Sequence, residues 1–208
     1  MDIREAMRSA AVALIAAATF AGTTQAASAA TSAQLTADLA ALWTKVLETP
    51  SDQNPFGSPT ANACWDLGKN IVAPFGPSEV ESCTVKPGTR IFVVGSSVEC
   101  STFEEESPPC GPDLSRSAKA ATPKVTSVTV DGRTVLLSEV LTSRQPITLP
   151  PNNLFGVDAG SQGEFVADGW VTLLHPLTPG THVIVGPTFT TTIVVQPGLT
   201  HTHVPPGT

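Results

Sequence analysis

From residue 90 onward, the chain alternates short runs of β-branched and aromatic residues with turns that contain proline or glycine. β-Branched and aromatic side chains fit the pleated surface of a sheet, whereas Pro and Gly end strands. Several strands without intervening helices favour two antiparallel sheets packed face to face. We therefore predict a mainly β fold, an antiparallel β-sandwich of the jelly-roll or immunoglobulin-like kind. The predicted strands cover residues 90–94, 125–130, 134–138, 163–175, 181–185 and 189–195.

The dipeptide Asp131-Gly132 predicts a two-residue hairpin turn between two of these strands. Both positions of such a turn require positive φ, which Asp and Gly tolerate. In that register Val128 lies opposite Val135, and the hairpin has one apolar face.

One helix is predicted, over residues 32–47, because leucines and Trp43 recur there at helical spacing behind a Thr31 or Ser32 cap. Pro50 ends it. The proline-rich stretch 49–81 shows little periodicity and is predicted to be a loop region ordered by its cysteines, and 101–123 to be a long exposed loop. The predicted organisation is a signal peptide (1–29), a docked helix (30–50), a disulfide-stapled sandwich (51–196) and a flexible tail (197–208).

The first residues are typical of a secretory signal peptide. Arg4 and Arg8 precede an apolar run, and the small residues Ala27-Ser28-Ala29 suit a signal peptidase. The run is shorter than the about 20 apolar residues that a membrane span needs. We expect a secreted protein, extracellular or periplasmic, without a membrane span.

Four cysteines, Cys64, Cys83, Cys100 and Cys110, lie beyond the signal peptide. An even count in an oxidising compartment predicts two disulfides. Three pairings are compatible with four cysteines; we favour Cys64 with Cys83 and Cys100 with Cys110, since each pair closes a short segment rich in Pro and Gly. The competing interpretation is a zinc site, but no C-x-x-C or paired-His spacing supports it. The net charge of −7, with Lys and Arg scattered singly, also argues against a nucleic-acid partner.

Three runs resemble a family of uncharacterised secreted bacterial proteins. They are CTVKPGTRIFVVG (83–95), VTVDG (128–132) and VADGWVTLLHPLTPGTH (166–182). Family members share a Cys followed by a Pro-Gly turn and an apolar strand, a Val-Asp-Gly hairpin, and a DG-W/Y segment that ends in PL-x-PG-x-H. The resemblance spans residues 64–195, is diffuse between the motifs, and implies a secreted β-rich domain without naming catalytic residues.

His175 and His182 flank a Pro- and Gly-containing loop, and Asp168 or Glu164 precedes them. Two imidazoles and a carboxylate could hold a metal or relay protons, which makes a small secreted hydrolase or metal-dependent enzyme the alternative function. The favoured interpretation is structural: His182 fixes the loop through backbone hydrogen bonds and His175 lies on the surface. The acidic trio 104–106 predicts a solvated loop. The His201 and His203 pair in the tail predicts adventitious metal binding.

Trp65 and Trp170 are candidate ligand contacts, because exposed indole faces can stack on sugar rings; burial in the core is the favoured alternative for each. The sequence therefore predicts a secreted, non-catalytic binding or cell-envelope-associated module. Its unknown extracellular ligand is a glycan or a protein, and no cofactor is expected. The candidate contacts are Trp65, Trp170, Asp168, His175 and His182.

Overall fold

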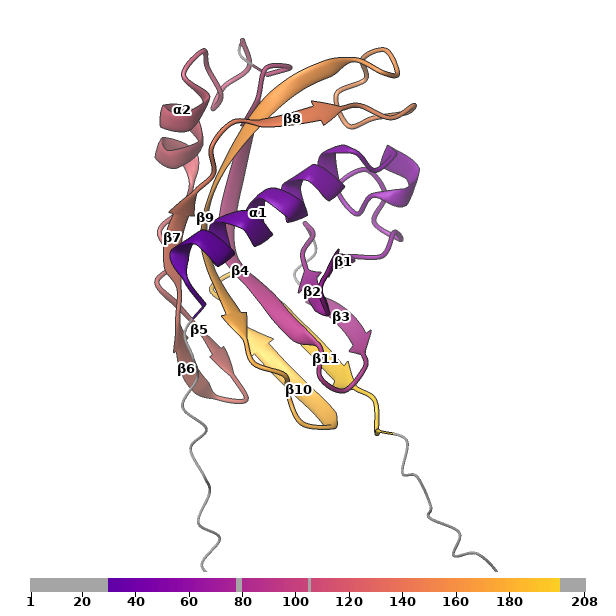
Figure 1. Ribbon diagram of the computed structural model, residues 1–208, viewed down its shortest axis with the longest axis vertical. Coiled ribbons are helices and arrows are strands. Elements are labelled where there is room, and N and C mark those ends of the chain that lie inside the picture. The colour runs from indigo at the N-terminus through magenta and orange to yellow at the C-terminus, as the bar shows by residue number, and fades with distance from the viewer. Residues whose placement is uncertain (1–29, 78–79, 105, 199–208) are drawn as a thin grey trace, which may run out of the picture.

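A computed structural model of the protein describes residues 30–77, 80–104 and 106–198. These residues form two β-sheets and two α-helices (Figure 1), so the predicted mainly β sandwich with an N-terminal helix is confirmed. In chain order the elements are α1 (Ser32–Leu47), a 3₁₀ turn (Ser51–Gln53), β1 (Cys64–Gly68), β2 (Ile71–Pro74), β3 (Val80–Val85), β4 (Arg90–Ser101), α2 (Leu114–Ala121), β5 (Ser127–Val130), β6 (Arg133–Leu136), β7 (Ser138–Leu141), β8 (Gln145–Thr148), β9 (Gln162–Leu174), β10 (Gly180–Val185) and β11 (Thr190–Val195).

The two sheets share strands from all parts of the chain. Sheet A has the order β1-β2-β4-β9-β7, and β8 also pairs with β9. Sheet B has the order β3-β11-β10-β5-β6. Most neighbours are antiparallel, but β2 pairs with β4, and β3 with β11, in parallel. The chain leaves sheet A after β2, runs through β3 in sheet B and returns as β4, which gives β2 and β4 the same direction.

The predicted loop over residues 49–81 is wrong in part, because it contains β1, β2 and the start of β3. β1 and β2 form a hairpin whose two turn residues, Lys69 and Asn70, have φ of 50° and 60°. Lysine gives no signal for a turn with positive φ. The four-residue β2 is also too short to show a period.

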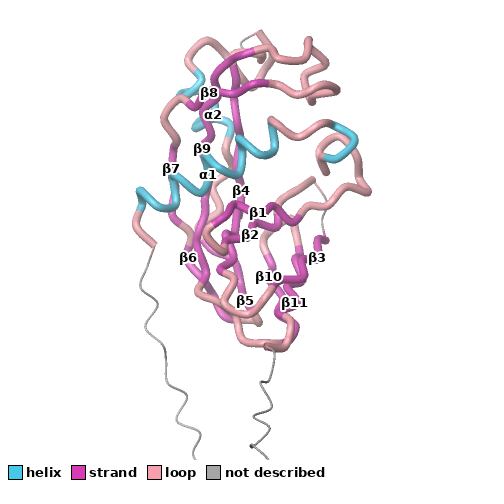
Figure 2. The backbone as a smooth tube through the Cα atoms, turned by 45° about the vertical axis from the view of Figure 1, so that its right-hand side comes forward, coloured by secondary structure: helices cyan, strands magenta, loops and turns pink. Residues whose placement is uncertain are grey.

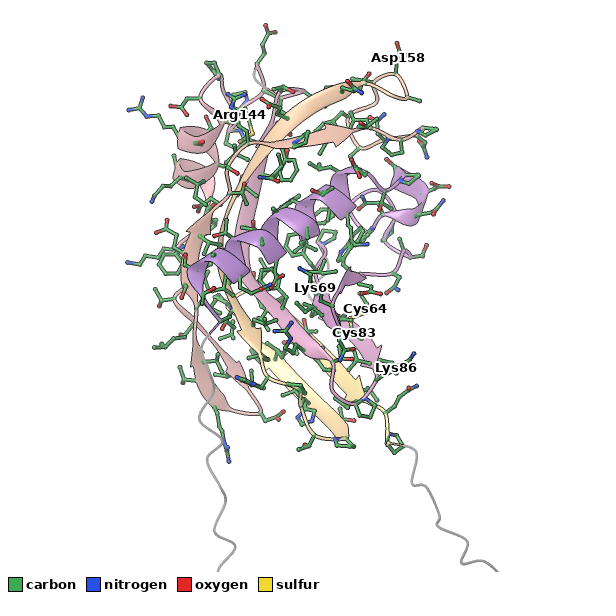
Figure 3. All side chains as sticks on the ribbon, in the orientation of Figure 1. Cys64, Lys69, Cys83, Lys86, Arg144 and Asp158 are labelled. Carbon is green, nitrogen blue, oxygen red and sulfur yellow. A yellow bond between two sulfur atoms is a disulfide. The ribbon has the colours of Figure 1, made fainter. Side chains whose placement is uncertain are left out.

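The favoured cysteine pairing is confirmed, with disulfides Cys64–Cys83 and Cys100–Cys110. The first joins the edge strand β1 of sheet A to the edge strand β3 of sheet B (Figure 3). The second ties the end of β4 to the loop before α2. Since all four cysteines form disulfides, none is available to a zinc ion.

Helix α1 covers one face of sheet A, with the bounds that its sequence predicts. The Thr31 hydroxyl caps it by accepting a hydrogen bond from Gln34 N at 3.2 Å. Figures 1 and 2 show α1 crossing the sheet, where it packs against β9, β7, β8 and β1. Trp43 Nε1 donates to Ser97 Oγ of β4 at 2.9 Å, which anchors the helix to the sheet. Its buried side chains are Leu35, Asp38, Leu39, Leu42, Trp43, Val46 and Leu47.

The opposite face of sheet A is shared between sheet B and helix α2, which packs against β4 and β9. The predicted exposed loop over 101–123 is therefore wrong at α2. Leu114 and Ala118, one turn apart, are buried against Cys100 and Val166. A helix of eight residues with two buried positions is too short to give a clear periodic pattern. Within the described residues, no helix is long and apolar enough to cross a membrane.

The hairpin between β5 and β6 is confirmed. Val128 pairs with Val135 as predicted, and Asp131 and Gly132 have φ of 49° and 75°. The turn lies beside β10, because β10 pairs with β5. Asp131 therefore contacts residues of β10.

Candidate functional site

His182 binds Asp131 of the β5–β6 hairpin turn, and not the predicted Asp168 or Glu164. Its Nδ1 lies 2.7 Å from Asp131 Oδ2, and its Nε2 lies 2.8 Å from the Thr178 carbonyl oxygen. Val183 N donates to the other Asp131 oxygen at 2.9 Å. Because both ring nitrogens face acceptors, the protonated imidazole fits the arrangement, and the hydrogen bond to Asp131 raises the pKa of His182. The same bond lowers the pKa of Asp131.

Asp168 is fully buried on β9, where it pairs with Val98 of β4 and Leu141 of β7. Within the described part of the chain, neither of its carboxylate oxygens has a hydrogen-bond partner. Burial raises the pKa of this carboxyl group, with Glu139 as a further, like-charged contribution. A carboxyl group enclosed in this way cannot serve as an accessible metal ligand.

His175 lies on the surface just after β9, beside a shallow cleft that includes Thr31, Gln34 and Arg90. Six residues of extended strand, about 20 Å, separate Asp168 from the end of β9. The structure therefore does not bring His175, His182 and Asp168 together. Among the described residues, no three His, Cys, Asp or Glu side chains are grouped to hold a metal ion. His201 and His203 lie outside the described residues.

The two candidate tryptophans are integrated into the protein interior. Trp65 is 8% exposed, and its Nε1 donates to the Phe75 carbonyl oxygen at 2.7 Å. Trp170 is half-buried against the core between the sheets, with Lys124 Nζ 5.7 Å from its ring centre. Neither ring forms an open platform for a sugar.

Glu99 and Glu104 form an acidic pair that sequence reasoning did not single out as a site. Burial, and then the charge of Glu104, raise the pKa of Glu99 to about 9. Glu104 caps the end of β4, because its Oε2 accepts from the backbone nitrogen and the hydroxyl of Ser101 at 3.3 and 2.9 Å. The only signal in the sequence is one glutamate between Val98 and Cys100.

A cleft of about 370 Å³ opens between the sheets at the point where β4 bulges. Gly95 forms the bulge, and a Cβ there would collide with the Leu137 side chain. Phe189 folds over Gly186 in the β10–β11 turn and forms one wall, and Phe75 forms another. None of the described lining residues is ionisable. They are Pro74, Phe75, Gly76, Pro77, Val94, Gly95, Ser96, Thr188, Phe189 and Thr191.

A second feature is the outer face of sheet B, the face that points away from sheet A. Alternate residues of its five strands point into the core, and their neighbours point outward. The strand pairing places the outward side chains in continuous rows, with Val183 opposite Thr192 near the centre. The outer face of sheet B consists of Ser82, Thr84, Ser127, Thr129, Thr134, Leu136, Thr181, Val183, Val185, Thr190, Thr192 and Val194.

Comparison with known protein families and with curated proteins finds no match to this chain. The function of the cleft and of the outer face is therefore argued from their own residues.

Proposed function

We propose that this protein is a secreted, non-catalytic binding or cell-envelope-associated module, and that its inter-sheet cleft holds the neutral end of a glycan. The observation that carries the proposal is the chemistry of the cleft lining, which combines two phenylalanine rings with hydroxyl groups and no ionisable side chain among the described residues.

The lining selects for an uncharged ligand. A charged group would lose hydration on entry and would find no opposite charge among the described lining residues, which costs several kcal/mol. Phe189 and Phe75, whose ring also packs against Trp43 and Phe56, contribute apolar surface for the C–H side of a sugar. Thr188, Thr191 and Ser96, whose hydroxyl already donates to the Pro123 carbonyl oxygen, contribute oxygen atoms for its polar side. A volume of about 370 Å³ lies within the range of small-molecule sites.

Export supports the same proposal. The two disulfides suit an oxidising compartment, where the predicted signal peptide would deliver the chain. The alternative enzyme built on His175, His182 and Asp168 has no support in the geometry, because the Asp131 carboxylate holds His182 and Asp168 is enclosed.

The test is binding of neutral oligosaccharides by the secreted protein, first on a glycan array and then by calorimetry. Thr188→Trp fills the mouth of the cleft from an exposed turn, and Thr178→Trp places the same ring on another exposed turn. We expect Thr188→Trp to weaken binding at least about tenfold, a change of about 1.4 kcal/mol, and Thr178→Trp to bind like the wild type. Absence of binding to every neutral glycan, or equal binding by both variants, would refute the cleft as the site.

A further inference from the structure

None of the twelve side chains on the outer face of sheet B, defined above, is ionisable. Charged residues make up 14% of this chain and about 25–35% of a well-solvated designed surface, so roughly two to four charges would be expected on twelve positions. This face has threonine, serine and valine instead, with Leu136 76% exposed and Val185 42% exposed.

We propose that the outer face of sheet B is a self-association surface, on which a second copy of this chain packs face to face. The proposal does not depend on the ligand of the cleft.

Charge distribution favours a second copy over a charged partner. The chain has a net charge of −7, so two copies repel each other across most of their surfaces. After Asp168, the sequence contains no Asp, Glu, Lys or Arg. β10 and β11, the strands that form the middle of sheet B, belong to this uncharged segment. Approach through this face keeps most acidic side chains of both copies away from the contact, and the one beside Val183, Asp131, is paired with His182.

The pairing geometry suits a symmetric contact. Val183 and Thr192 are register partners on β10 and β11, near the centre of the face. A two-fold axis there would bring the same two side chains from both copies together, as an isologous interface requires. Valine and threonine methyl groups would then pack between two sheets about 10 Å apart, the spacing of face-to-face sheets.

The size of the face sets the expected strength. The five strands lie about 4.8 Å apart; β3, β10 and β11 have six residues each and β5 and β6 have four, so the face covers about 400 Å² in projection. A standard interface buries about 800 Å² per partner. The accessible surface of a corrugated face exceeds its projection, but even with the edge rows the face is smaller than a standard interface. We therefore expect a dimer with a dissociation constant in the micromolar range.

The test is sedimentation equilibrium of the full secreted protein from about 1 µM to about 500 µM, which spans the expected dissociation constant. Val183→Lys places a charge at the centre of the face. Leu141→Lys is the matched control, because Leu141 of sheet A and Val183 are each 38% exposed. We expect the wild type and Leu141→Lys to dimerise alike, and Val183→Lys to weaken dimerisation at least about a hundredfold, or about 2.7 kcal/mol.

Thr192→Glu is the second variant and introduces the opposite charge, so that loss of the dimer in both cannot be assigned to one poorly folded protein. Thermal melts of each variant check the fold. A wild type that stays monomeric throughout the concentration range would overturn the proposal and mean that the face is solvated or binds another molecule. A dimer that persists in both variants would overturn it as well, because the contact would then lie elsewhere.

Discussion

Sheet A and sheet B differ in how many of their faces are covered. Sheet A has α1 on one face and sheet B with α2 on the other, and five consecutive residues of β9, from Phe165 to Gly169, are buried. In β11 of sheet B the burial alternates, with Thr191, Ile193 and Val195 inside. Continuous burial marks a strand enclosed on both sides, and alternation marks a strand with one free face. The burial pattern of a strand therefore reports on the layers around it.

A core residue of sheet A should contribute far more to the free energy of unfolding than an outward residue of sheet B. Phe165→Ala removes a fully buried ring beneath α1 and should lower the free energy of unfolding by about 3–5 kcal/mol. Thr192→Ala should change it by less than about 0.5 kcal/mol. Urea unfolding at a concentration where the chain is monomeric measures both. Equal losses would mean that the outer face of sheet B is not free in the monomer.

Removing the link between the sheets should have the next largest effect. The loop closed by Cys64–Cys83 has a sequence separation of 19, and replacing both cysteines by alanine should cost about 3 kcal/mol. Cys100–Cys110 closes a loop of separation 10 within the sheet A side, and its removal should cost a few tenths of a kcal/mol less. Denaturant midpoints of the two double variants give the order. If loss of Cys100–Cys110 cost more stability than loss of Cys64–Cys83, the packing of α2 would depend on its disulfide more strongly than the packing between the two sheets depends on theirs.

The elements with local patterns were predictable from sequence. α1 has a cap and a long apolar stripe, and the β5–β6 hairpin has an Asp-Gly turn and alternating valines. The short elements were not, because their stability comes from partners distant in sequence: β2 lies between β1 and β4, and α2 lies on β4 and β9. Propensity over four to eight residues is too weak to reveal such elements.

The candidate site was less predictable than the fold. The spacing of His175 and His182 describes a loop, whereas the direction of the His182 ring depends on β10 lying beside the β5–β6 turn. The cleft likewise combines the end of β2, the bulge of β4 and the β10–β11 turn. No local sequence pattern joins these three segments.

The buried carboxyl group of Glu99 on β4 should make the stability of the protein depend on pH. The pKa of Glu99 is raised from 4.5 to about 9, so folding takes up a proton between these values and stability falls as the pH rises through this window. Glu99→Gln keeps the shape without an ionisable group. At pH 8 we expect it to be stabilised by about 1 kcal/mol or more, a rise in melting temperature of about 2–4 °C, and to show little difference at pH 4. A loss of stability at pH 8 would mean that the Glu99 carboxylate is charged and well solvated.

The smallest expected effect comes from sheet B, where the ionic contact is near the surface. The pKa of His182 is raised by its bond to Asp131, so its stabilising contribution is complete below the unfolded pKa of about 6.5 and is lost as the pH rises through the folded value. His182→Gln removes the charge and should lower stability by about 0.5–1 kcal/mol at pH 5.5 and by less at pH 8.5. Melting curves at both pH values in low salt measure the difference. Since the pKa of Asp131 is lowered by the same bond, Asp131→Asn should remove the pH dependence as well, while the Asn side chain can still accept from Val183 N. If Asp131→Asn retained the wild-type pH dependence, the imidazole would draw its stabilisation from the Thr178 carbonyl and not from the carboxylate.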